Sequence, residues 1–96
     1  MLDQKNMDNE LEELLRAFLV LTSTQETKAL LDDLCTLKEV QAMAQRLQVA
    51  RLLREGRTFT DIVERTGASS ATIARVNRCL QAGPGGYQTV LDRLDK

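Results

Sequence analysis

The side chains with the clearest potential for chemistry lie between residues 69 and 78, where hydroxyl and methyl groups accompany two arginines. Short side chains let a helix approach base edges closely, and alanine methyl groups can pack against those of thymine. Arginine matches phosphate oxygens and the acceptor edge of guanine. The segment therefore favours contact with double-stranded DNA. The residues expected to face bases are Ser69, Ser70, Ala71, Ala74 and Arg75, and those expected nearer the phosphates are Thr72 and Arg78.

A short helix is predicted to begin just after Thr58. The Thr58 hydroxyl can cap this helix, and Asp61 stands in its first turn, where free N–H groups favour a carboxylate. Ile62 and Val63 are expected to give the helix an apolar face. Gly67 then stands where the chain must turn, in a backbone conformation that residues with a Cβ resist.

A second helix is predicted after this turn, with Ser69 as its cap. Ile73, Val76 and Leu80 are spaced by three and four residues, so they are expected to face the core. Residues 58–81 therefore predict a helix–turn–helix, a motif whose second helix enters the major groove when it binds DNA. The alternative is an ordinary hairpin of two amphipathic helices, which is common in all-α proteins.

The rest of the chain has the apolar spacing of further helices. Capping boxes are predicted at Ser23–Glu26 and Thr36–Glu39, the second of which begins a long helix that ends at Gly56. The run Gly83-Pro84-Gly85-Gly86 separates the motif from a last short helix. We predict a single all-α domain of six helices, with residues 1–8 disordered, 9–56 forming core and dimerisation helices, 58–81 the motif, and 86–95 the last helix.

Composition argues against several other classes of protein. The chain has no histidine, and its two cysteines lack the spacing of a zinc site, so no metal or other cofactor is expected. Adjacent acidic pairs on helices, such as Glu12 with Glu13, do not converge on one point, so no enzyme is predicted. No apolar run is long enough to span a bilayer and no signal peptide is recognisable, so the expected location is the cytoplasm, without membrane contact.

Charge is divided unevenly along the chain. Four basic and nine acidic residues give residues 1–41 a net charge of −5, whereas nine basic and five acidic residues give residues 42–96 a net charge of +4. The predicted motif lies in the basic half, where every basic residue except the last is an arginine. This division favours an acidic body with a basic DNA-binding part, although contact between subunits is an alternative use of the same charges.

The first predicted helix carries more leucine than a monomer of this size can cover. Its apolar stripe consists of Leu11, Leu14, Leu15, Phe18 and Leu19. A second copy of the chain is the predicted partner, since a two-fold dimer also places two recognition helices about one DNA turn, roughly 34 Å, apart. The alternative is that the stripe folds back onto the chain's own core.

Several short motifs stand in a specific order along the predicted helices: Leu34-Cys35-Thr36, Arg46, Leu52-Leu53-Arg54-Glu55-Gly56, Gly67-Ala68 and Ala71-Thr72-Ile73-Ala74-Arg75. With these motifs and this order of helices, the chain resembles the tryptophan repressor family over roughly residues 9–95, most closely its YerC/YecD branch. This resemblance implies an intertwined, all-helical homodimer that binds an operator and represses transcription.

The resemblance also implies a place for a small anionic corepressor. By position, Thr36, Arg46 and Arg75 correspond to residues that hold tryptophan in the family's repressor. Val76 stands where that repressor has a glycine that makes room for the indole, and Cys79 stands where it has a serine. These two differences predict that the site does not take tryptophan. The alternative role of the two arginines is structural, as ion-pair partners of Glu39, Glu64 or an acidic residue of the other subunit.

The resulting hypothesis is a sequence-specific regulator, most simply a repressor, that binds a palindromic operator as a homodimer without tryptophan. Val63 stands where the family's repressor has a lysine that helps the first motif helix reach DNA. Whether the first motif helix of this chain contacts DNA is therefore in question. Two alternatives stay open: a helix–turn–helix that binds a protein of the transcription machinery, and a repressor that responds to a different small anionic ligand.

Overall fold

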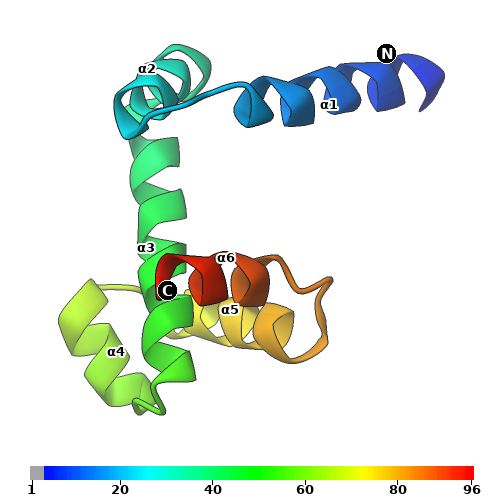
Figure 1. The fold of residues 1–96 in the computed structure, drawn as a ribbon. Coiled ribbons are helices and arrows are strands. Elements are labelled where there is room, and N and C mark those ends of the chain that lie inside the picture. The colour runs from blue at the N-terminus through cyan, green and yellow to red at the C-terminus, as the bar shows by residue number, and fades with distance from the viewer. Residues whose placement is uncertain (1–3) are drawn as a thin grey trace. The chain divides into compact units, whose positions relative to one another are not determined.

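The computed structural model describes residues 4–96, with side chains from Met7 onward. It contains six α-helices and, within these residues, no strand (Figure 1). The helices are α1 (Gln4–Leu19), α2 (Thr24–Leu34), α3 (Leu37–Arg54), α4 (Phe59–Thr66), α5 (Ser70–Ala82) and α6 (Gly86–Leu94). The six-helix, all-α prediction is confirmed. The chain divides into two compact units, one ending at Leu37 and the other formed by Lys38–Lys96.

The first unit contains α1 and α2. Residues 4–8 are helical, where the sequence predicts disorder; this segment has no glycine or proline to oppose extension of the helix, and residues 1–3 lie outside the described residues. At the start of α2, the Ser23 hydroxyl accepts a hydrogen bond from the Glu26 N–H at 3.1 Å. The Glu26 carboxylate accepts bonds from the N–H of Thr22 at 2.8 Å and from its hydroxyl at 3.0 Å. The predicted cap therefore forms, and its carboxylate bonds to Thr22, one residue before the cap.

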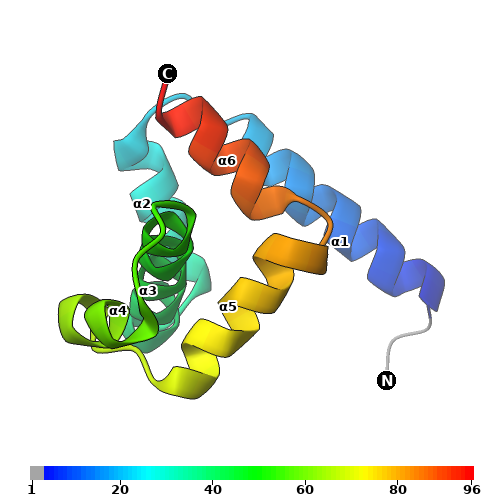
Figure 2. The ribbon, with the colours of Figure 1, turned by 90° about the horizontal axis from the view of Figure 1, so that it is seen from below.

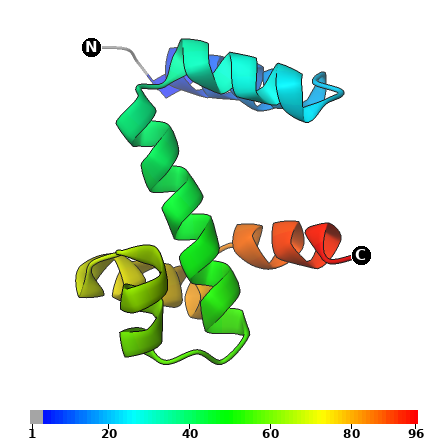
Figure 3. The same ribbon diagram turned by 90° about the vertical axis from the view of Figure 1, so that its left-hand side faces the viewer.

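The second unit is built around the C-terminal half of α3, with α4, α5 and α6 placed about it (Figures 2 and 3). Gly56 ends α3 as predicted, with a positive φ of 83°. Its N–H donates to the Leu53 carbonyl at 3.0 Å, and the Arg57 N–H donates to the Leu52 carbonyl at 3.1 Å. This pair of bonds is a Schellman motif, which reverses the chain directly into the next helix.

The core of the second unit draws on α3, the helix–turn–helix and α6. Its buried members are Val49, Ala50, Ile62, Ala68, Ile73, Val76 and Leu91. Two ion pairs at its surface join α3 to α6 and to the residue that follows it, Arg54 to Asp92 at 2.7 Å and Arg51 to Asp95 at 2.6 Å. The basic residues of α3 nearest Gly56 are thus neutralised within the unit. No helix in the described part of the chain is long and apolar enough to cross a membrane.

Candidate nucleic-acid interface

The first helix of the motif, α4, begins at the predicted cap. The Thr58 hydroxyl accepts a hydrogen bond from the Asp61 N–H at 3.1 Å. Ile62 is fully buried, whereas Val63 is 41% exposed, so the two apolar side chains expected on this helix lie on different sides of it. Successive residues of a helix point about 100° apart, and α4 packs on only one side. Phe59, one turn before Val63, is also exposed, so the two form an apolar strip on the outer side of α4.

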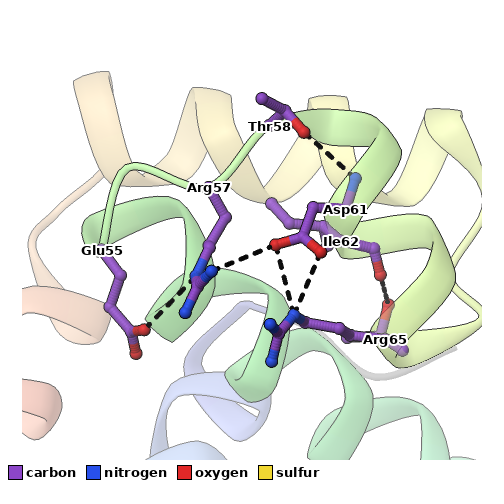
Figure 4. Close-up of polar contacts among 7 residues, drawn as sticks. Glu55, Arg57, Thr58, Asp61, Ile62 and Arg65 are labelled. Carbon is purple, nitrogen blue, oxygen red and sulfur yellow. Dashed lines mark hydrogen bonds and ion pairs between the residues drawn. The ribbon is translucent and has the colours of Figure 1, made fainter.

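An acidic side chain of α4 orders two arginines beside the motif. The Asp61 carboxylate lies between the guanidinium groups of Arg57 and Arg65 (Figure 4). Its Oδ2 is 3.6 Å from Arg57 Nη1, and Arg65 Nε donates to its two oxygens at 3.1 and 3.2 Å. Arg57 Nε is also 3.8 Å from Glu55 Oε1. Two arginines and two carboxylates therefore leave this side of α4 without net charge.

The turn between the two motif helices is closed by local hydrogen bonds. Gly67 has the predicted left-handed conformation, with φ of 72°, and its N–H donates to the Val63 carbonyl at 2.9 Å. The Thr66 hydroxyl donates to the Ile62 carbonyl at 2.7 Å and accepts from the Ala68 N–H at 3.1 Å. Sequence reasoning missed this role of Thr66, although a hydroxyl residue directly before a turn glycine is a usable signal for it.

The second motif helix, α5, begins at Ser69 as predicted. The Ser69 hydroxyl accepts a hydrogen bond from the Thr72 N–H at 3.1 Å and lies 3.1 Å from the Thr72 hydroxyl, to which it donates. Ile73 and Val76 are buried, as expected from their spacing, and Leu80 is half-buried. The capping and inward-facing residues thus hold α5 in a fixed rotation against the core.

The residues predicted to contact DNA lie on the accessible side of α5 and its cap. Arg75 and Arg78 are exposed, and within the described part of the chain neither makes an ion pair. No acidic residue occurs anywhere in α5. The other exposed residues of the set are Ser69, Ser70 and Ala71, while Thr72 and Ala74 are half-buried. This side of α5 therefore combines small and hydroxyl groups at its start with two unneutralised guanidinium groups.

Two residues of the implied corepressor site line one cavity in the second unit. Arg46 and Cys79 line a common cavity of about 520 Å³, whose other walls include Met43, Leu47, Pro84, Tyr87 and Val90. Arg75 is not among its lining residues, and Val76 is 1% exposed inside the core. Thr36 belongs to the unit that ends at Leu37. The alternative role of Arg75, as an ion-pair partner within the protein, also gains no support. Its guanidinium pairs with no carboxylate among the described residues.

Comparison with known proteins gives matches over nearly the whole chain. Residues 9–95 match the family described as Trp repressor protein. Protein YerC of Bacillus subtilis (strain 168) is 51% identical over 85 residues, which are 88% of this chain and 82% of YerC. The crystal structure of a TrpR-like protein from Eubacterium eligens ATCC 27750 superposes with a TM-score of 0.90 at 44% identity, over 97% of this chain and 96% of that one. These similarities confirm the resemblance drawn from the short motifs.

Proposed function

This chain belongs to the Trp repressor family, and on that premise we propose that it binds a two-fold symmetric operator in double-stranded DNA as a homodimer and represses transcription without tryptophan. Membership indicates a helix–turn–helix DNA-binding regulator rather than an enzyme. The symmetric operator, the dimer, the repression and the independence from tryptophan are the proposal. A protein with this role works in the cytoplasm beside the DNA that it regulates.

The observation that carries the proposal is the free side of α5. Arg54 is paired with Asp92 of α6 and Arg51 with Asp95 directly after it, while Arg57 and Arg65 share Asp61. These four arginines are therefore poor candidates for phosphate contact. Arg75 and Arg78 are exposed without an ion pair among the described residues. Unpaired arginines on a recognition helix can form charge-assisted bonds to phosphate or guanine without first breaking an internal pair.

The apolar side of α1 supports the homodimer. Leu11 and Leu15 are each 53% exposed and Leu19 is 83% exposed. Contiguous apolar surface of this kind marks sites of protein contact. A second copy of the chain is the proposed partner, because a two-fold dimer presents two α5 helices to two halves of one symmetric site.

The buried position of Val76 supports independence from tryptophan. Its branched side chain packs in the core between α5 and its neighbours. The resemblance places the indole of the family's ligand at this position. Protein atoms therefore replace the ligand in the proposed mechanism, and α5 keeps one angle in the absence of any corepressor.

The experiment that tests the proposal is a selection of random duplex DNA by the full chain near physiological salt, with and without a pool of amino acids. Enrichment of a two-fold symmetric sequence without additives is expected. Enrichment of no sequence in either arm would refute the proposal and favour the protein-binding alternative. Affinity for the selected duplex should fall steeply as salt is raised, because arginines that neutralise phosphates release counterions.

The side chain to test first on the selected duplex is Arg75. We expect Arg75→Ala to weaken specific binding by about 1–3 kcal/mol if the guanidinium contacts a base, with no change in melting temperature because it makes no ion pair among the described residues. The matched control is Arg93→Ala, which removes from α6 another exposed arginine that makes no ion pair among the described residues. Equal losses of affinity in the two variants would show that Arg75 contributes charge alone.

The cavity beside Arg46 favours a second candidate function, response to a small anionic ligand other than tryptophan. Its walls are mostly apolar, and they include Arg46 and Tyr87, whose side chains carry a guanidinium and a phenol. Such a lining suits a carboxylate attached to an apolar body. A rise in melting temperature with one member of a panel of aromatic and aliphatic acids, lost in Arg46→Ala, would support this function.

A further inference from the structure

We infer that Gln45 is a positioning residue for DNA recognition, because its side-chain amide holds the turn of the helix–turn–helix against α3. Gln45 Nε2 donates a hydrogen bond to the Thr66 carbonyl at 3.1 Å. The bond is partly buried and joins residues 21 positions apart. The inference rests on the proposed DNA binding and adds the residue that fixes the recognition helix.

The acceptor of this bond is a carbonyl that the helix itself leaves without a partner. Thr66 is the last residue of α4, and the final carbonyls of an α-helix have no intrahelical donor. The Thr66 side chain is already engaged with the Ile62 carbonyl and the Ala68 N–H. Gln45 therefore completes a network in which both the hydroxyl and the carbonyl of Thr66 are held, one by the motif and the other by α3.

A fixed Thr66 also fixes the start of α5, because only three residues separate them. Gly67 turns the chain, Ala68 is 2% exposed and belongs to the core, and Ser69 caps α5. None of these residues offers a flexible linker that could absorb a displacement of the Thr66 carbonyl. The first turn of α5 follows at once with Ser70 and Ala71, two of the side chains proposed to face bases.

Gln45 lies on a different side of α3 from the cavity that Arg46 lines. Arg46, the next residue, lines the cavity next to α6, whereas Gln45 lines a groove that reaches Arg65 and Thr66 of α4. Adjacent helical residues point about 100° apart, which places the two side chains on different sides of α3. The turn is thus held by the protein's own amide, from a side of α3 that does not line the cavity.

Two other glutamines in this groove provide matched controls. Gln41 and Gln48 line it together with Gln45, and within the described residues neither side chain makes a hydrogen bond. Both are exposed, whereas Gln45 is half-buried. A substitution at Gln48 therefore makes the same chemical change on the same helix without removing a bond to the motif.

The experiment compares Gln45→Met and Gln45→Glu with Gln48→Met and Gln48→Glu in the full chain. Methionine keeps the length of the side chain without a donor, and a carboxylate keeps its shape but can only accept. Binding is measured on the selected duplex and on a scrambled duplex of the same composition, and melting temperature is measured in parallel. We expect Gln45→Met to lower the ratio of selected to scrambled affinity about threefold to tenfold, the range for one hydrogen bond. Gln45→Glu should lower the ratio at least as much, and the Gln48 variants should leave it unchanged.

The ratio distinguishes positioning from general stability. A purely structural role would lower binding to both duplexes together with the melting temperature and leave the ratio constant, and that result would overturn the inference. An unchanged ratio in both Gln45 variants, at wild-type stability, would overturn it as well. If the wild-type chain bound neither duplex, the proposed function would fail, and this is a different outcome from wild-type binding that Gln45 does not influence.

Discussion

Gly67→Ala is expected to destabilise the protein through the backbone alone. The φ of Gly67 is +72°, and a Cβ built at this position has no heavy atom within 4 Å, so no steric clash contributes. A residue with a Cβ pays about 1–2 kcal/mol for the left-handed conformation. For a domain of this size, each 1 kcal/mol lowers the melting temperature by about 4–8 °C. We therefore expect a decrease of at least about 4 °C, measured by thermal and urea unfolding at one protein concentration.

The same substitution at Gly86 provides the control. A Cβ at Gly86 also meets nothing within 4 Å, but this residue lacks a positive φ and begins α6. Gly86→Ala is expected to leave stability unchanged or raise it by up to about 1 kcal/mol, because alanine loses less entropy in a helix. Gly67→Asn should cost less than Gly67→Ala, since asparagine tolerates the left-handed region. If Gly67→Ala and Gly86→Ala melted at the same temperature, the assignment of the cost to backbone conformation would be refuted.

Two further predictions concern surface interactions. Arg54→Ala and Asp92→Ala should each lower stability by about 0.2–1 kcal/mol, because their side chains are 31% and 61% exposed; a double-mutant cycle should give a coupling that decreases with salt, and a coupling that is independent of salt would contradict this. The backbone N–H and then the hydroxyl of Thr22 donate to Glu26 and hold its pKa below the ordinary value. A lowered pKa in the folded state stabilises at neutral pH, and this contribution is lost as the pH falls through that pKa. Glu26→Gln should therefore be less stable than wild type at pH 7, with a difference that disappears in acid; an equal difference at both pH values would count against the role of the carboxylate.

Helix boundaries were predictable wherever the deciding contact lies within one helical turn. Thr58 and Ser69 each cap a helix by accepting from the N–H three residues later. Gly56 and Gly67 have the left-handed conformation that ends α3 and α4. These features depend on side-chain type and on distances that helix geometry itself sets, so the sequence contains the information they need.

The sequence predicted which residue types lie on the candidate interface. It predicted less well how the neighbouring residues of α4 and of the cavity are arranged. The spacing in α5 identifies Ile73 and Val76 as buried and leaves Arg75 and Arg78 outside. In α4 the spacing does not decide between Ile62 and Val63, since an eight-residue helix is too short to show which of two adjacent apolar residues faces the core; Ile62 is buried and Val63 is exposed. The implied corepressor residues were named by position, and Arg46 and Cys79 of that set line one cavity in the second unit.

The sequence by itself determined the six helices, the turn of the motif and the small, hydroxyl and arginine side chains at its accessible surface. The tertiary structure decided which arginines are neutralised, as in the pairing of Arg54 with Asp92, 38 positions away. It also decided how the turn is held, by the hydrogen bond from Gln45 to Thr66, 21 positions away. Residues within one turn have separations fixed by the helix they form. Residues this far apart meet only after apolar side chains have packed one helix on another, and the sequence pattern shows that such packing must occur without showing which polar groups it brings together.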